Sequence, residues 1–215
     1  MQIAVIDLGM GNLRSVAQAL TTVAPQASVR VTADATEIGA ADRVVLPGQG
    51  AIGSWLDTLV ERELQACLND ALQDKPVLGI CVGMQALFDH CEEDGGRSGL
   101  GLFAGSVQHF SHFHTAAQRS LKVPHMGWNQ VAQIHPHPLW HNVDDNSHFY
   151  FVHSYCANAA DDADLGMVYG SCDYGHQFIA AVGHENVFAV QFHPEKSHSD
   201  GLQLLKNFTV WNGVV

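Results

Sequence analysis

The chain has 215 residues, of which 47% are hydrophobic and 15% are charged, a composition typical of a globular protein that excludes a disordered chain or a coiled coil. Ten Lys and Arg residues stand against 22 Asp and Glu residues, so the net charge is −12 at neutral pH. A nucleic-acid backbone or an anionic membrane would repel such a chain, and neither is an expected partner.

Strand-length runs of apolar, β-branched residues recur through the first half of the chain, separated by longer segments of helical spacing. The runs lie at Ile3–Ile6, Val29–Thr32, Arg43–Leu46 and Val77–Ile80. Between them we expect a helix over Asn12–Val23, with Asn12 able to cap it, and a second helix that spans Trp55 to Leu68 and ends before Pro76. This alternation of strands and crossover helices predicts a parallel sheet.

From about Gly99 the pattern changes to strand-like runs joined by loops that contain His and Pro. These runs lie at Ser106–Phe110, His148–His153, Met167–Tyr169, Phe178–Val182 and Val187–Phe192. A final helix is expected near Leu202–Val210. No repeat and no Gly/Ser linker divides the chain, so we expect one domain over residues 1–215, with the loop Asp94–Gly99 as its weakest join. The predicted fold class is α/β: an open sheet, mostly parallel and flanked by helices, with extra antiparallel strands in the second half.

Cys81 stands where a buried strand meets a helical segment, in the pattern Gly79-Ile80-Cys81-Val82-Gly83. The flanking glycines allow the sharp turn of a nucleophile elbow, which lifts one side chain above the sheet. At a helix N-terminus, unpaired N–H groups and the helix dipole stabilise a thiolate. An isolated cysteine after an apolar strand is more often a small core residue, and it is the two glycines that favour a nucleophile.

His193-Pro194-Glu195 forms a second candidate group near the end of a predicted strand. A cysteine nucleophile needs a base to take or share its proton and a third group to orient that base. In an extended strand, His193 and Glu195 point to the same face, so their side chains can reach each other. Alone, His193 is one of 14 histidines and reads as a solvated loop residue. Together with the elbow at Cys81, it indicates a catalytic pair.

The loop Pro47-Gly48-Gln49-Gly50 follows the third predicted strand. In an open α/β sheet, ligands bind beyond the carboxyl ends of the strands, and a Gly-rich loop there can direct backbone N–H groups at an oxyanion. Such a sequence alone is commonly only a turn. The other two motifs give it a functional meaning.

These three motifs, in this order along the chain, resemble those of the triad-type (class I) glutamine amidotransferases, whose fold is a flavodoxin-like open sheet. The resemblance implies that Cys81 attacks the side-chain amide carbon of glutamine, that His193 passes a proton to the departing ammonia, and that Glu195 orients His193. Water then hydrolyses the γ-glutamyl thioester to glutamate. The positions implied for the oxyanion hole and for glutamine binding are Gly48, Gln49, Gly50, Val82 and Gln85.

Four further segments resemble one subfamily, the glutaminase subunits of a two-subunit enzyme of histidine biosynthesis. They are Ile6–Ser15, Val123–Asn129, Tyr150–Tyr155 and His193–Ser197. The resemblance implies L-glutamine as substrate, no cofactor, and a partner that receives the ammonia, namely a (β/α)8-barrel cyclase subunit. Positions matching the partner-facing surface, as candidates for interface contacts and signalling, are Asn12, Trp128, Tyr150, His153 and Lys196.

Two positions depart from the subfamily pattern. Leu8 stands where the opening motif has Tyr, and it follows a buried strand, so packing can absorb the loss of the hydroxyl. Gln49 stands where an apolar residue such as Val is common. If this loop must flip to form the oxyanion hole, a polar side chain there changes the balance between its resting and active states.

Three other interpretations stay open. The chain is alternatively another class I amidotransferase subunit, a stand-alone cysteine hydrolase of γ-glutamyl substrates, or a non-catalytic regulatory protein of the same fold. Activity without a partner distinguishes the hydrolase, and the joint presence of Cys81, His193 and Glu195 argues against a non-catalytic protein.

Neither a metal site nor an oxidising compartment is expected. Two groups of histidines, without a Cys or acidic partner at zinc spacing, lie at His109, His112 and His114 and at His135, His137 and His141. The five cysteines are an odd number with no CxxC pair, and Met1 leads into a strand-like run rather than a basic signal segment. We therefore expect a cytoplasmic location.

Overall fold

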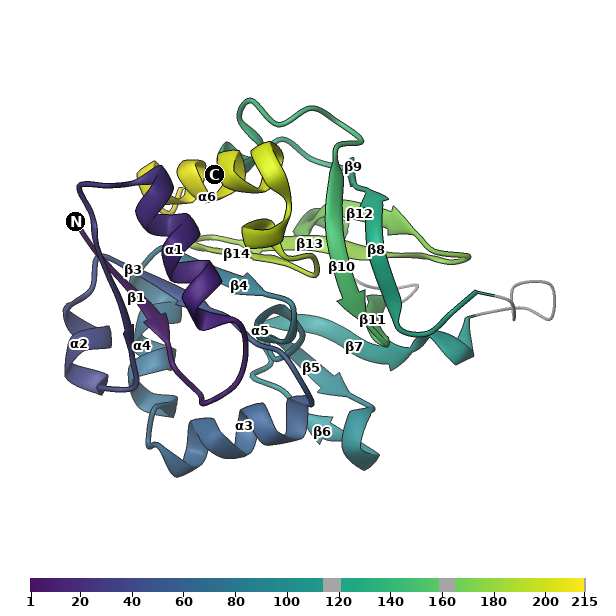
Figure 1. Cartoon of the computed structure of the whole chain (residues 1–215). Helices are drawn as coiled ribbons and strands as arrows, with labels where there is room; N and C mark the ends of the chain where they lie inside the picture. The colour runs from purple at the N-terminus through teal and green to yellow at the C-terminus, as the bar shows by residue number, and fades with distance from the viewer. Residues whose placement is uncertain (114–120, 159–164, 215) are drawn as a thin grey trace.

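The structure, a computed structural model, describes residues 1–113, 121–158 and 165–214. Within these residues, twelve strands form one mixed sheet in the order β2-β1-β3-β4-β14-β13-β11-β7-β5-β6, with β12 paired to β13 and β9 to β12 (Figure 1). The strands are β1 (Gln2–Ile6), β2 (Ser28–Thr32), β3 (Arg43–Leu46), β4 (Val77–Ile80), β5 (Phe88–Cys91), β6 (Arg97–Ser98), β7 (Phe103–His109), β9 (Ala132–Gln133), β11 (Tyr155–Asn158), β12 (Val168–Asp173), β13 (Gln177–His184) and β14 (Val187–Val190). A separate two-stranded ribbon joins β8 (His125–Gln130) to β10 (His148–His153).

The strands β2, β1, β3, β4 and β14 pair in parallel and carry helices on both faces. The helices are α1 (Leu13–Val23), α2 (Ala35–Ala40), α3 (Ile52–Glu61), α4 (Gln65–Asp74) and α6 (His198–Val210). Helix α1 packs against α6 on one face, and α2 packs against α4 on the other (Figure 1). Strands covered on both faces are apolar throughout, and every residue of β4 and β14 is buried. No helix in the described ranges has both the length and the apolar character needed to cross a bilayer.

The predicted parallel strands are confirmed, and β1 and β2 each begin one residue earlier than expected. The predicted single helix from Trp55 to Leu68 is wrong, because two helices occupy this segment. Helix α3 ends at Glu61 and α4 begins at Gln65. Glu63 has a left-handed φ of 57°, which breaks the helix although no Gly or Pro marks the position.

The second half of the sheet is antiparallel where β13 pairs with β14 and where β11 pairs with β13 and β7. The predicted strand at Val187–Phe192 ends at Val190, and the final helix begins at His198, four residues before the expected Leu202. The predicted loop Asp94–Gly99 contains the strand β6 and part of a 3₁₀ turn. Strand β8 was not predicted, because its Gly and Asn residues do not favour strands.

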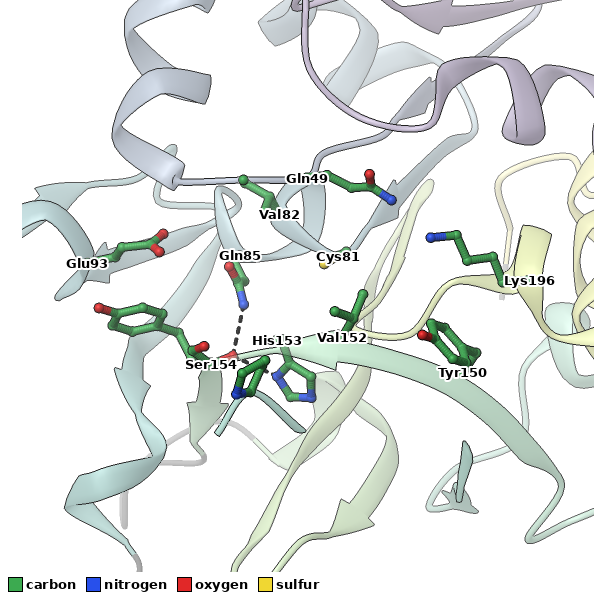
Figure 2. A pocket seen from close by; sticks show the side chains of 13 residues that line it. Gln49, Cys81, Val82, Gln85, Glu93, Tyr150, Val152, His153, Ser154 and Lys196 are labelled. Atoms are coloured by element: carbon green, nitrogen blue, oxygen red, sulfur yellow. Dashed lines mark hydrogen bonds between the residues drawn. The ribbon is translucent and has the colours of Figure 1, made fainter. Parts of the chain in front are cut away.

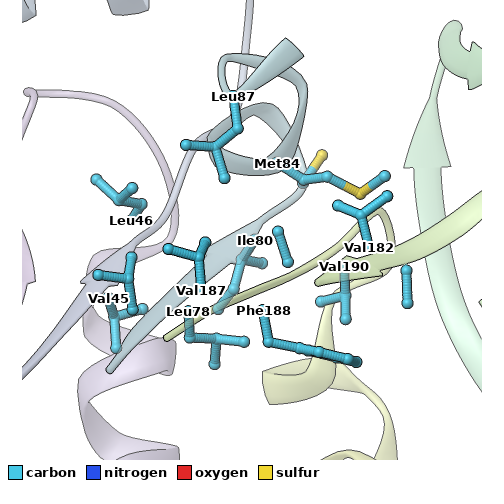
Figure 3. Close-up of a cluster of buried hydrophobic side chains, with 14 of the residues drawn as sticks. Val45, Leu46, Leu78, Ile80, Met84, Leu87, Val182, Val187, Phe188 and Val190 are labelled. Carbon is cyan, nitrogen blue, oxygen red and sulfur yellow. The ribbon is translucent and has the colours of Figure 1, made fainter. Parts of the chain in front are cut away.

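Buried hydrophobic side chains of the described residues form one cluster that continues beneath the ends of β4 and β14. Leu78 of β4 lies opposite Phe188 of β14, and Val190 and the Met84 side chain of α5 (Val82–Gln85) belong to the same cluster (Figure 3). None of these four side chains is measurably exposed. Because truncating such a side chain to Ala costs about 2–5 kcal/mol, the cluster holds the two strand ends in a fixed relation.

Candidate functional site

Cys81 lies in the sharp turn between β4 and α5, as the elbow pattern predicts. Its φ of 54° and ψ of −110° lie in a sparsely populated region for a residue with a side chain. The Cys81 N–H donates to the Val190 carbonyl at 2.8 Å, and the Cys81 carbonyl accepts from the N–H groups of Met84 and Gln85. Helix α5 has only four residues, so the dipole of a long helix, expected from the sequence, does not act on this thiol.

Two glycines allow the loops around Cys81 to approach each other closely. A Cβ atom on Gly83 would lie 1.9 Å from the Leu46 carbonyl oxygen, and one on Gly48 would lie 2.7 Å from Val82 Cβ. The loop Pro47–Gly50 therefore packs directly on the elbow. The Val82 N–H makes no hydrogen bond within the described residues, which leaves it available to an oxyanion.

His193 and Glu195 follow the end of β14, the parallel neighbour of the strand that carries Cys81. His193 Nδ1 and Glu195 Oε1 are 3.0 Å apart, and the two side chains are 2% and 1% exposed. The predicted contact between them is therefore present, although the backbone has already left the strand and formed the 3₁₀ turn η6 (Pro194–Lys196). The His193 N–H donates to the Tyr150 carbonyl of β10 at 2.9 Å, which anchors this turn to the ribbon.

The electrostatics of His193 favour the charged imidazolium. Burial alone lowers the pKa of His193, but the nearby Cys81 thiolate and the Glu195 carboxylate outweigh burial and raise this pKa above its usual value. His193 Nε2, on the opposite side of the ring from Glu195, has no partner at hydrogen-bond geometry among the described residues. His193 can therefore carry a proton on Nε2 that is free for transfer to a substrate.

Gln191 is a site residue that the sequence motifs did not single out. It lies directly after β14, is fully buried, and its Nε2 donates to Cys81 Sγ at 3.6 Å. Its Oε1 accepts from Gln85 Nε2 at 2.9 Å, and the same Gln85 nitrogen donates to the Tyr155 carbonyl at 3.0 Å. A polar side chain in an otherwise apolar, buried run was the signal in the sequence, because such groups persist only when hydrogen-bonded.

A cavity of about 470 Å³ opens beside Cys81, within the size range of small-molecule sites (Figure 2). Gln49, Gly50, Val82 and Gln85, all expected at the site from the sequence, line it together with Cys81. The arrangement suits a small polar ligand with a group held close to the sulfur.

Glu93 and Lys196 also line this cavity, and their charged side chains lie on opposite sides of Cys81 (Figure 2). Glu93 was not predicted as a site residue, and its place in an acidic run gave no signal. Its Oε2 accepts from the Ile52 N–H at 2.9 Å. Burial raises the pKa of the Glu93 carboxyl, and the Ile52 N–H opposes this effect.

His125 and His153 form a buried, hydrogen-bonded pair at the edge of the cavity. His125 Nδ1 lies 3.0 Å from His153 Nε2. His153, which Figure 2 shows, has its Nδ1 2.8 Å from the Tyr155 carbonyl. Burial lowers the pKa of His125 to about 4 and that of His153 to about 3, so both rings are neutral at pH 7. His153, placed by the sequence among the partner-facing candidates, is buried and lines the cavity instead.

Trp128 and Tyr150 lie opposite each other in the ribbon of β8 and β10. Trp128 is 43% exposed, and its ring stacks on His198 with centroids 4.6 Å apart. Tyr150 is half-buried, and Lys196 Nζ lies 5.7 Å from its ring centroid. Asn12 is half-buried before α1 and makes no capping hydrogen bond with its side chain, contrary to the expected cap.

In the part of the chain that the structure describes, no three His, Cys, Asp or Glu side chains are arranged to hold a metal ion. His109 Nδ1 lies 2.8 Å from Ser111 Oγ, and His112 Nε2 lies 3.0 Å from a carboxylate oxygen of Glu92. His114, from the same group of histidines, lies outside the described residues. The expected absence of a metal site therefore stays a prediction.

A family model described as glutamine amidotransferase class-I matches residues 4–211 of the chain. The chain is 55% identical over 211 residues to imidazole glycerol phosphate synthase subunit HisH of Dechloromonas aromatica, a match that covers 97% of this chain and 96% of that protein. It is 51% identical over 211 residues to the subunit of the same name from Pseudomonas putida, covering 98% of each chain.

Solved structures of low sequence identity share the fold. A putative GMP synthase subunit from Thermoplasma acidophilum superimposes with a TM-score of 0.67 at 22% identity, covering 97% of this chain and 92% of that one. The glutaminase domain of Trypanosoma brucei CTPS with bound acivicin gives a TM-score of 0.63 at 16% identity, covering 97% and 94%. The predicted open α/β sheet is thereby confirmed at the level of the fold.

Proposed function

The chain belongs to the class I glutamine amidotransferase family, and from this premise we propose that it is the glutaminase subunit of an imidazole glycerol phosphate synthase. It releases ammonia from L-glutamine for histidine biosynthesis. The observation that carries this proposal is the strained Cys81 elbow beside the buried His193–Glu195 pair, at a cavity of amino-acid size. Identities of 55% and 51% over nearly the full chain support the choice of subunit within the family.

The proposed reaction has two chemical steps. The Cys81 thiolate attacks the side-chain amide carbon of glutamine, and the carbonyl electron pair moves onto oxygen. His193 Nε2 then gives its proton to the amide nitrogen as the C–N bond breaks, so that ammonia leaves and a γ-glutamyl thioester remains. Water attacks the thioester while His193 takes its proton, which frees glutamate and restores the thiolate. Glu195 orients His193 through the 3.0 Å contact.

The oxyanion of both steps needs two hydrogen-bond donors on one side of Cys81. The Val82 N–H, which has no partner among the described residues, supplies one donor. We assign the second to an N–H group of the Gly48-Gln49-Gly50 loop, which packs on Val82 and lines the cavity at Gln49 and Gly50. Gly50 has a φ of +89°, so this loop can change its peptide orientation without a side chain opposing the turn.

Gln85 and Glu93 are assigned to the binding of glutamine. Both hydrogens of Gln85 Nε2 are used within the protein, so its oxygen is the group that can accept a hydrogen bond from the substrate. Glu93 supplies a carboxylate on one side of the cavity, where an α-ammonium group would be attracted. Both side chains line the cavity on the same side of Cys81 (Figure 2).

The partner that we propose is the (β/α)8-barrel cyclase subunit of imidazole glycerol phosphate synthase, which consumes the ammonia. Its docking surface includes Trp128, Tyr150 and Lys196, of which Trp128 and Lys196 both lie against the Tyr150 ring. Asn12 is assigned to the edge of this surface. His153 is buried, so its role is to transmit a change from the ribbon to the cavity rather than to touch the partner.

Two further expectations complete the proposal. The chain forms one domain over residues 1–215, which the continuous cluster of buried hydrophobic side chains supports. It works in the cytoplasm, where its odd number of cysteines stays reduced.

The proposal is tested by glutamate release from glutamine, measured for the chain alone, with the cyclase, and with the cyclase together with its nucleotide ligand. We expect strong stimulation only in the complete mixture, and no turnover by Cys81→Ser in any mixture. Full activity of the chain alone would instead indicate a stand-alone γ-glutamyl hydrolase. Absence of turnover in every mixture would indicate a non-catalytic protein of the same fold or a subunit of another class I amidotransferase.

A further inference from the structure

We propose that Gln191 is a positioning residue of this site: its amide directs a hydrogen-bond donor at the Cys81 sulfur, and its orientation is fixed through Gln85 by the Tyr155 carbonyl. The inference rests on the proposed role of Cys81 as nucleophile. It adds a residue to which the sequence motifs gave no role and which the oxyanion loop does not contain.

The direction of the hydrogen bonds near Cys81 follows from which groups can donate and which can only accept. The Tyr155 carbonyl can only accept, so the Gln85 atom that contacts it is the amide nitrogen. The second hydrogen of that nitrogen goes to Gln191 at 2.9 Å, where an oxygen must accept it. The remaining end of the Gln191 amide, which faces Cys81 Sγ at 3.6 Å, is therefore N–H. A thiolate accepts such a bond, and its negative charge strengthens it.

The same reasoning determines which ring nitrogen carries the proton in the two histidines on the other side of the Tyr155 carbonyl. His153 Nδ1 must carry the proton that this carbonyl accepts, at 2.8 Å. Because the ring is neutral, His153 Nε2 accepts, and the donor is the Nδ1 proton of His125 at 3.0 Å. His125 Nε2 then accepts from Asn129 Nδ2 at 3.3 Å. Every donor in this part of the chain points toward the Tyr155 carbonyl.

The Asn129 amide, at the outer end of these hydrogen bonds, is held by two backbone groups. Its Nδ2 also donates to the Asp173 carbonyl at 2.8 Å, and its Oδ1 accepts from the Gln130 N–H at 2.9 Å. A flip of this amide would break both bonds. The orientation of the Asn129 amide is therefore independent of the histidines, and it agrees with donation by both histidines toward the Tyr155 carbonyl.

The position of Gln191 makes its donor hard to replace. The side chain is fully buried, so water cannot take over the bond to the sulfur when the amide is removed. Gln191 supplies a fixed dipole beside the sulfur, whereas the charged groups near the sulfur are His193, Lys196 and Glu93. A donor to the charged form of Cys81 favours the thiolate and holds the sulfur in one direction.

The test is the pH dependence of Cys81 alkylation by iodoacetamide in the full-length chain, followed by peptide mass mapping. Gln191→Met keeps the length of the side chain and removes the donor. We expect the alkylation midpoint of this variant to rise by about one pH unit, the effect of one hydrogen bond to a charged group. Gln177→Met, at the start of β13, removes a side-chain hydrogen bond from an amide to Ser171 of β12; this variant is the control and keeps the original midpoint.

A second comparison tests the chain itself. Gln85→Met removes the anchor of Gln191, so it should raise the alkylation midpoint in the same direction, and the double variant should shift it no further than Gln191→Met alone. An unchanged midpoint in Gln191→Met, or additive shifts in the double variant, would overturn the inference. Because alkylation needs no turnover, an absence of glutaminase activity in every mixture would overturn the proposed function and leave the measured alkylation midpoints unaffected.

Discussion

Glu195 acts on the substrate only through His193, so at the scale of single residues one substitution tests how its charge affects the pKa of His193. In Glu195→Gln the imidazolium loses the carboxylate that stabilises it, so the pKa of His193 falls and less of the ring holds the proton that ammonia needs. We expect glutamate release by the complex to fall by about 10²-fold or more. Steady-state assays measure this, with the exposed Glu61→Gln of α3 as the charge-matched control. Equal rates for the two variants would contradict the assignment.

Trp128 tests the docking surface at the same scale. It is the largest exposed ring on the ribbon, and its stacking on His198 holds it in place before a partner arrives. Because a rigid exposed Trp is typical of a residue that dominates an interface, Trp128→Ala should raise the dissociation constant for the cyclase subunit by at least about tenfold. Titration calorimetry measures the change. Val210→Ala, which truncates a 76% exposed side chain at the end of α6, should leave the constant unaltered.

At the scale of elements, the close approach of α5 to β3 controls whether the elbow can form. Gly83→Ala would place its Cβ 1.9 Å from the Leu46 carbonyl oxygen, so β3 and the elbow must move apart. We expect the free energy of unfolding to fall by several kcal/mol, roughly 3 or more, as for other strained substitutions in a packed core. Gly39→Ala in α2 meets no atom within 4 Å and should be neutral or slightly stabilising. Urea titration of both variants decides, and equal midpoints would contradict the argument.

Elements also show what the sequence can predict and what it cannot. Strands such as β4 were predictable because both faces are buried, which produces an unbroken apolar run. The break at Glu63 was not, because a left-handed residue other than Gly leaves no mark in the sequence.

In the site, His193 and Glu195 were predictable because they are two residues apart. Gln85 and Gln191 are 106 residues apart, and their contact exists only because β4 and β14 are neighbours in the sheet. Long-range contacts of this kind follow from topology, which local patterns do not contain.

At the scale of the whole molecule, buried neutral histidines make stability depend on pH. Burial lowers the pKa of His137 to about 4, as it does for His125, and that of His153 to about 3. In the unfolded chain these rings take up protons near pH 6.5, so the unfolded state binds more protons as the pH falls below this value. The free energy of unfolding therefore decreases from pH 6.5 downward, by roughly 2 kcal/mol for each ring at pH 5.0.

Urea unfolding at pH 7.5 and pH 5.0 measures this loss. His137→Asn keeps an acceptor for the Leu139 N–H, lies away from the cavity, and removes one titrating ring. We expect the loss between the two pH values to be smaller in this variant by the contribution of one ring, roughly 2 kcal/mol. A loss of the same size in both proteins would show that other groups cause it.

The parallel register of β4 and β14 sets the distance between Cys81 and Gln191. Ile80, the last residue of β4, pairs with Val190, the last residue of β14. Cys81 and Gln191 follow directly, so their backbones lie about one strand spacing, roughly 4.8 Å, apart. The pairing of the two strands sets this distance, although Cys81 and Gln191 are 110 residues apart in the sequence. Insertions and deletions in the loops of that intervening stretch can therefore accumulate during descent while the distance between Cys81 and Gln191 is kept, provided that the two strands still pair and Gln85 keeps its contact with Gln191.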